Sequence, residues 1–149
     1  MVNETFEQLI LNTKKNHQNY LNPIPVVMGL IHKGNKLVVV KNNHNLKHWQ
    51  LVSGFIDPDE SAEEAMIREA MEETGLKVKI DQIIGTFPSQ KHIIKLVIVF
   101  KLKYLSGKLT AQDDIVEAKW VDVNENTKFR KGSLSEYIYK KYKNNEKQI

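Results

Sequence analysis

Short runs of β-branched and aliphatic residues alternate with polar turns along most of the chain. The runs "VVMGLI" (26–31) and "KLVVVK" (36–41) are separated by "HKGN", a pattern that predicts a β-hairpin. Further strands are predicted at 50–54, 77–87, 92–105 and 117–123. Most of the chain is therefore expected to form a sheet.

Helical periodicity occurs at both ends of the chain. Residues 4–19 predict a short amphipathic helix within an N-terminal extension, 1–22, and the apolar side of this helix consists of Phe6, Leu9 and Ile10. At the other end, "SLSE" has the spacing of a capping box and predicts a C-terminal helix over 133–145. The apolar side of that helix is expected to consist of Leu134, Tyr137, Ile138 and Tyr142.

A third helix is predicted between the strands. Ser61 and Glu64 also have capping-box spacing, and Gly75 can take the left-handed conformation that ends a helix, so we expect a helix over 62–74. Strands before and after one central helix imply an α/β fold, with helices packed on a mixed sheet. A length of 149 residues suits one domain, so we expect 1–149 to form a single domain.

The composition excludes several classes of site. The chain has no cysteine, which excludes a disulfide framework, a thiolate zinc site and a cysteine nucleophile, and fits a reducing compartment; we expect a cytoplasmic protein. "MVNETFEQLI" lacks the pattern of a secretion signal, and no apolar run approaches the ~20 residues of a membrane helix. The net charge is +4, but the lysines are scattered, so a solvated surface is favoured over a nucleic-acid partner.

The acidic residues, by contrast, are concentrated in "GFIDPDESAEEAMIREAMEETGL", residues 54–76. On the predicted helix, Glu69, Glu72 and Glu73 share an arc about 100° wide. Like charges at this spacing cost about 0.2–0.5 kcal/mol per pair, and the helix dipole disfavours anions in the last turn. A solvated acidic face is the alternative, but little lysine within the helix offsets the cost. We therefore expect a divalent cation, whose natural second partner is a phosphate.

Arg68 lies one turn before Glu72, and its guanidinium has a fork geometry that lysine lacks. We expect it to orient a carboxylate, either Glu72 or Glu60, in preference to contacting phosphate directly. An ordinary surface ion pair is the alternative. The other side of the helix is expected to pack against the sheet through Ile67, Ala70 and Met71.

The segment 54–76 resembles the signature of the Nudix hydrolases. Its fixed positions are filled by Gly54, Glu60, Arg68, Glu69, Ala70, Glu72, Glu73, Gly75 and Leu76, with Ala70 smaller than the usual aliphatic residue. The resemblance implies an α/β/α sandwich with a mixed β-sheet and a pyrophosphohydrolase that depends on Mg²⁺ or Mn²⁺. Its substrate would be a small nucleotide, a nucleoside diphosphate linked to another moiety, such as NAD(H), ADP-ribose or a nucleotide sugar.

The resemblance also implies roles by motif position. Glu69 and Glu73 would be the main metal ligands, Glu72 a further ligand or the general base, and the backbone carbonyl of Ser53 another ligand. The expected catalytic group consists of Glu72, Arg68 and Glu60. The ions would neutralise pyrophosphate charge and acidify a bound water, while a glutamate takes the proton as water attacks phosphorus in line.

Beyond the signature, "SGKLTAQDDIVEAKWVDVNE" is similar to the catalytic domain of the NAD(H) pyrophosphatases, in which a glutamate ahead of the tryptophan supplies a metal ligand. Glu117 matches that position, and an edge-strand glutamate is an equal alternative. The chain lacks a zinc-ribbon cysteine set, and "TFPSQKHIIK" stands where those enzymes carry a Ser-Gln-Pro-Trp-Pro-Phe-Pro block. The resemblance therefore does not select NAD(H) as substrate.

Three other residues are candidates for contact with the substrate. Phe55, directly after the motif glycine, is placed to stack on a base, with core packing as the alternative. Gln90 and Lys91 could approach the phosphates or the sugar, with a solvated hairpin as the alternative.

Two other functions use the same scaffold. A non-catalytic nucleotide sensor usually loses motif carboxylates, so the complete set here favours catalysis. An RNA 5′-end processing enzyme would use the same chemistry, but the sequence contains no visible nucleic-acid module. A homodimer is compatible with the resemblance, and the sequence does not decide it.

Overall fold

The computed structural model describes residues 5–16, 21–90 and 93–146. In chain order the elements are α1 (Phe6–Asn16), β1 (Ile24–Lys33), β2 (Lys36–Asn42), β3 (Val52–Phe55), α2 (Ala62–Thr74), β4 (Lys77–Ser89), β5 (Lys95–Ser106), β6 (Ile115–Asp122) and α3 (Leu134–Glu146). Each predicted strand and helix has a counterpart among them, with boundaries that differ by a few residues.

The strands form one mixed sheet around β1. Along the sheet the order is β4-β5-β1-β2-β6, and β3 also pairs with β1. The β1–β5 pair is parallel and the other pairs are antiparallel, so the expected mixed sheet is confirmed. The predicted hairpin is the β1–β2 pair, and its turn contains Gly34, whose φ of 60° is easily accessible to glycine. β1 is therefore the central strand of the sheet.

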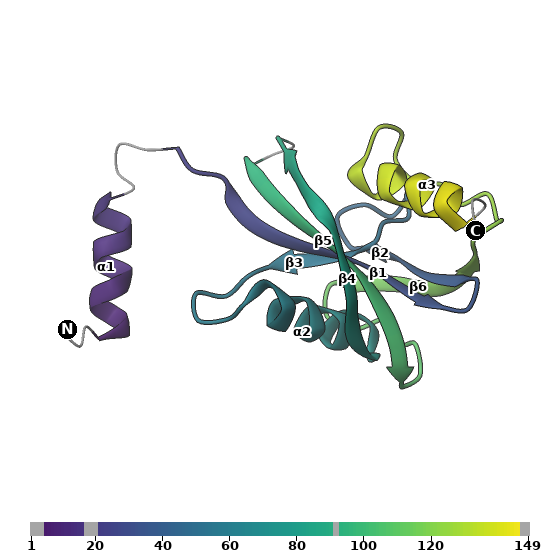
Figure 1. Ribbon diagram of the computed structural model, residues 1–149, viewed down its shortest axis with the longest axis horizontal. Helices are drawn as coiled ribbons and strands as arrows, with labels where there is room; N and C mark the ends of the chain where they lie inside the picture. Colours follow the sequence, from purple (N-terminus) through teal and green to yellow (C-terminus); the bar gives the residue numbers. More distant parts are fainter. Residues whose placement is uncertain (1–4, 17–20, 91–92, 147–149) are drawn as a thin grey trace.

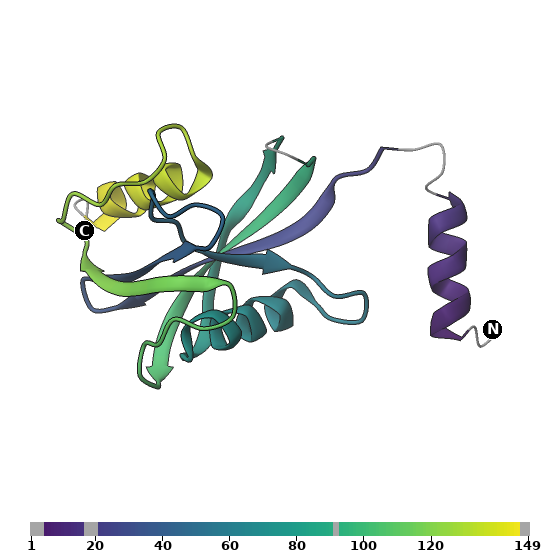
Figure 2. The same cartoon turned by 180° about the vertical axis from the view of Figure 1, so that it is seen from behind.

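Helices cover both faces of this sheet, so the predicted α/β/α sandwich is confirmed. Alternate side chains of a strand point to opposite faces, and each face carries its own apolar core. On one face, Val27 and Val38 pack with Met66 of α2; on the other, Val39 and Val97 are buried with α3. Figure 1 shows α2 below the sheet and α3 above it, and Figure 2 shows the same arrangement from behind.

The buried side of α3 differs from the prediction at one position. Ile138 and Tyr142 are buried as expected, but Tyr137 is 53% exposed, and Tyr139 is buried in its place. The Tyr139 hydroxyl donates to the carbonyl of Val123, 3.1 Å away. Apolar periodicity cannot identify this contact, because a polar hydroxyl that binds a buried carbonyl lets the tyrosine ring enter the core.

Helix α1 confirms the predicted N-terminal helix within the described part of that segment. None of its residues is buried, and Figures 1 and 2 both show it apart from the sheet. Residues 4 and 17–19 of the predicted helix lie outside the described residues. Across the described chain, no helix has the length and apolar character needed to cross a bilayer. The division into an extension, 1–22, and a single domain remains a prediction.

The two tyrosines of α3 provide a matched test of this packing. We expect Tyr139→Phe to lower the free energy of unfolding by about 1–2 kcal/mol, because it leaves buried carbonyls without their donor. Tyr137→Phe, on the exposed side of the same helix, should change it by less than about 0.5 kcal/mol. Urea unfolding measures both values; equal effects would contradict the assigned packing.

Candidate active site

Helix α2 begins at the predicted capping box and ends at the predicted glycine. The Ser61 hydroxyl accepts from the backbone N–H of Glu64 (3.1 Å), and the Glu64 carboxylate accepts from the backbone N–H of Ser61 (3.3 Å). Gly75 has a φ of 72°, and its N–H donates to the carbonyl of Met71. These local contacts fix where the helix begins and ends, and so which loop and strand its carboxylates meet.

The rotation of α2 about its axis differs from the prediction. Ala70 packs against the sheet as expected, but Ile67 and Met71 are 40% and 45% exposed, and the helix is buried through Ala65 and Met66 instead. Small alanine side chains let the helix lie close to the sheet. With the helix this close to the sheet, the carboxylates of Glu69 and Glu73 lie against protein, whereas Glu72 remains partly exposed to solvent.

Arg68 gathers three of the four motif glutamates. Its Nη1 donates to Glu69 (2.9 Å) and to Glu72 (3.1 Å). Its Nε donates to both oxygens of Glu60, at 3.0 and 3.2 Å, and its Nη2 also contacts Glu60. Nη2 further donates to the backbone carbonyl of Phe55 (3.0 Å), so the guanidinium connects the helix to the end of β3. Arg68 thus contacts both carboxylates that the sequence offered as its alternatives, and Glu69 in addition.

Gly54 leaves room for the Glu69 carboxylate. A Cβ atom built on Gly54 would overlap that carboxylate, so any other residue would displace it from the strand. The Glu69 side chain is only 12% exposed. Its burial raises the pKa of the carboxyl, while Arg68 acts in the opposite direction. Glu60 is different, because hydrogen bonds from Arg68 lower its pKa.

Glu73 is the carboxylate that Arg68 does not hold. It is 6% exposed, and its Oε2 is buried without a hydrogen-bond partner among the described residues. Burial, and then the charges of Glu69 and Asp114, raise the pKa of the Glu73 carboxyl to about 8, against a backbone hydrogen bond from Ser53. Keeping this buried carboxyl ionised near neutral pH requires a positive partner. The donor set of Glu73, Glu69 and nearby backbone oxygen therefore fits a hard divalent cation such as Mg²⁺.

Two acidic residues near this group were not predicted from the sequence. Asp113 and Asp114 belong to the loop before β6, and their charges act on Glu73. Two backbone hydrogen bonds hold the loop to the end of α2: Thr110 N–H donates to the carbonyl of Thr74 (2.9 Å), and Gln112 N–H to that of Glu73 (3.1 Å). In the sequence, the only sign of these residues is the adjacent pair "DD". Because the pair is far from α2 along the chain, the sequence does not show that the two lie close together in the fold.

The carboxylate side chains do not converge on one point. Among the described residues, no group of three or more His, Cys, Asp or Glu side chains is arranged to hold a metal ion. Glu60, Glu69 and Glu72 are directed to Arg68 instead. Glu117 is not brought to this group: it lies beside Lys41 (3.5 Å) and is 57% exposed. Lys41 in turn covers the ring of Trp49, which belongs to the core on the α3 face, opposite α2.

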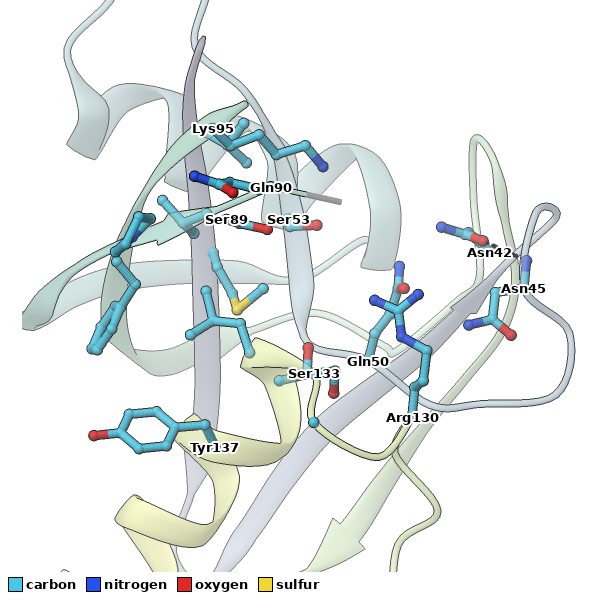
Figure 3. A pocket seen from close by; sticks show the side chains of 18 of the residues that line it. Asn42, Asn45, Gln50, Ser53, Ser89, Gln90, Lys95, Arg130, Ser133 and Tyr137 are labelled. Atoms are coloured by element: carbon cyan, nitrogen blue, oxygen red, sulfur yellow. Dashed lines mark hydrogen bonds between the residues drawn. The ribbon is translucent and has the colours of Figure 1, made fainter. Parts of the chain in front are cut away.

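A cleft of about 840 Å³ opens on the α3 face of the sheet, within the usual size range of small-ligand sites. Ser53 and Gln90 line it, and Figure 3 shows both near Lys95. Phe55 is 54% exposed, so the core alternative does not apply to it. It lies opposite Val26, another lining residue, and cross-strand partners share a face of the sheet. Lys91 lies outside the described residues.

Ser53 connects the cleft to the glutamates. Its side chain lines the cleft, while its backbone forms a hydrogen bond with Glu73. Within the part of the chain that the structure describes, β3 pairs with no strand other than β1, so one of its edges is open. In an antiparallel strand the N–H and C=O of one residue point to the same side. The carbonyl of Ser53 therefore points to the same open edge as its N–H, toward the end of α2.

Comparisons with known proteins agree with the resemblance of segment 54–76 to the Nudix signature. A model of the NUDIX domain matches residues 22–142. The chain is 38% identical over 117 residues to the ADP-ribose pyrophosphatase of Methanocaldococcus jannaschii, covering 74% of this chain and 68% of that protein. It is 27% identical over 125 residues to the NAD-capped RNA hydrolase NudC of Pseudomonas putida, covering 79% of this chain but only 44% of NudC.

Solved structures agree on the fold. The crystal structure of a Nudix hydrolase from Nitrosomonas europaea superposes with a TM-score of 0.76, at 22% identity, over 87% of this chain and 75% of that one. The family model spans the sheet, α2 and most of α3, and the signature residues are assembled around Arg68. The chain therefore belongs to the Nudix family of pyrophosphatases.

Proposed function

We propose that this Nudix pyrophosphohydrolase uses Mg²⁺ or Mn²⁺ to cleave the pyrophosphate bond of a nucleoside diphosphate linked to another moiety, with an ADP-ribose-like compound as substrate. The observation that carries the proposal is the buried, unpartnered Oε2 of Glu73 beside Ser53 and Glu69. The relative named an ADP-ribose pyrophosphatase supports the substrate class.

Glu73, Glu69 and the carbonyl of Ser53 would hold the metal. When bound, it would supply charge neutralisation at the pyrophosphate and lower the pKa of a coordinated water. Of the three glutamates that contact Arg68, Glu72 is the most exposed, at 47%. It is accessible to solvent and can accept a proton from water. We therefore assign it the role of general base.

Arg68 and Glu60 have a positioning role in this proposal. Arg68 donates to Glu60, Glu69 and Glu72, so its hydrogen bonds are largely occupied by protein. It is therefore suited to holding carboxylates in place rather than binding a phosphate. Phe55, the cross-strand partner of the cleft-lining Val26, offers an exposed ring on which a base can stack. Glu117, beside Lys41 on the face opposite α2, has no role in this arrangement.

The assignment of Glu73 is tested by an isosteric change. With saturating Mg²⁺ and ADP-ribose, we expect Glu73→Gln to lower kcat by at least about 100-fold, because the amide removes an anionic ligand at the reacting diphosphate. Release of AMP, followed by chromatography, measures the rate. Glu63→Gln, an exposed glutamate in the first turn of the same helix, should stay within about twofold. Full activity in Glu73→Gln would refute the metal assignment.

The raised pKa of Glu73 also predicts how stability depends on pH. The folded protein holds this proton up to about pH 8, whereas an unfolded glutamate releases it near its ordinary value of 4.5. Folding stability contributed by the protonated form is therefore lost as pH rises from about 4.5 through 8. In EDTA, wild-type protein should lose roughly 2–3 kcal/mol between pH 6 and 9 relative to Glu73→Gln.

Added Mg²⁺ should restore stability to the wild type at pH 8–9 and have less effect on Glu73→Gln, because a ligand that binds only the folded state stabilises it. Thermal and urea unfolding, at matched ionic strength, measure both effects. Parallel pH profiles for the two proteins would show that Glu73 is already ionised without metal, contrary to the prediction.

A further inference from the structure

One corner of the cleft is lined by side chains whose acceptor atoms are already occupied. The Oδ1 of Asn42 accepts from the backbone N–H groups of His44 (3.0 Å) and Asn45 (2.9 Å). The Oδ1 of Asn45 accepts from the backbone N–H of Lys47 (3.3 Å). A backbone N–H can only donate, so these contacts fix which side-chain atom is oxygen. The amide nitrogens of Asn42 and Asn45 are left as donors.

Arg130 adds a positive charge to the same corner. It is one of only two arginines in the chain, and it lines the cleft with Asn42 and Asn45. Among the described residues, none accepts a hydrogen bond or ion pair from its guanidinium, whereas Arg68 is engaged with several carboxylates. Figure 3 shows the two amide nitrogens on the side of Arg130.

The rest of the cleft provides no counter-charge. None of its described lining residues is aspartate or glutamate, and Lys95 contributes a second cation near Ser53. A sugar diol is usually bound by groups that include hydrogen-bond acceptors. A positively charged ring of a substrate would be expected to lie near a carboxylate. The corner also contains the amide of Gln50, which can turn either its nitrogen or its oxygen toward a ligand. With a guanidinium, two fixed amide donors and no carboxylate, it is complementary to an oxyanion.

We propose that this donor corner, Asn42, Asn45 and Arg130, binds a phosphate group of the substrate, with Arg130 as its charged contact. The guanidinium fork matches two phosphate oxygens, and the amide nitrogens can reach others. The proposal rests on the proposed function, because it assigns one part of that substrate. Two phosphates are candidates: the scissile diphosphate itself, and a further phosphate carried on the ribose of the nucleoside.

The kinetic test compares ADP-ribose with its 2′-phosphorylated derivative. We expect Arg130→Met to raise KM by about 10- to 100-fold, the range of one charge-assisted hydrogen-bonded contact, and to change kcat by only a few fold. Arg130→Lys should recover part of the loss, because it keeps the charge without the fork. Lys131→Met removes the same charge one residue away, outside the cleft lining, and should match wild type.

Asn42→Asp is the sharper variant. Aspartate keeps the Oδ1 that accepts from His44 and Asn45, so the loop should be preserved, but it replaces the donor nitrogen with an anionic oxygen. If a phosphate lies in the donor corner, this change should raise KM at least about tenfold, and added salt should reduce the effect. Unchanged or improved binding by Asn42→Asp would overturn the proposal, because a hydroxyl or cationic group would tolerate or prefer the carboxylate.

The two substrates separate the two phosphates. An equal loss for both in Arg130→Met places the scissile diphosphate in the corner, and a larger loss for the phosphorylated derivative places the further phosphate there. No change with either compound overturns the proposal.

Calorimetric titration of both compounds in EDTA, where no metal contributes, provides a readout that does not need activity. An inactive wild type that still binds in an Arg130-dependent way would refute the proposed hydrolysis and keep the donor corner. An active wild type whose affinity does not depend on Arg130 would support the proposed hydrolysis and overturn the donor corner.

Discussion

The acidic site depends on the contacts of Arg68 with Glu60, Glu69 and Glu72. Three carboxylates in such proximity repel one another, and one guanidinium among them converts that repulsion into an ordered set of hydrogen bonds. The same group reaches the carbonyl of Phe55, so helix, loop and strand share one anchor. Arg68 does not contact Glu73, so the buried Oε2 of Glu73 is the carboxylate oxygen that still needs a positive partner.

Strand β3 separates two chemically opposite environments. On one side Gly54 lets the Glu69 carboxylate lie against the backbone, and on the other Ser53 faces a cleft lined by cations and amide donors. Because β3 is short and open along one edge, a diphosphate at that edge can meet both environments at once. The carboxylates would then act through a cation, whereas the donors act on phosphate oxygens directly.

Local signals explain why the sequence predicts so much of the fold. The ends of α2 depend on Ser61 and Gly75 and their immediate neighbours, so sequence spacing is sufficient to place them. The rotation of the helix depends on how closely it approaches the sheet, which spacing does not determine, and Met71 is therefore exposed. Asp113 and Arg130 belong to loops whose positions depend on long-range strand register, so their places beside the site become visible only once the chain is folded.

The backbone hydrogen bonds of Thr110 and Gln112 to the last turn of α2 have a consequence for how the acidic site is maintained. Helix-end carbonyls that would otherwise need water are satisfied by the loop that carries Asp113. Fraying of that turn would therefore release the loop, and movement of the loop would expose the turn. The two segments are expected to open as one cooperative unit, with a shared hydrogen-exchange protection for their amides.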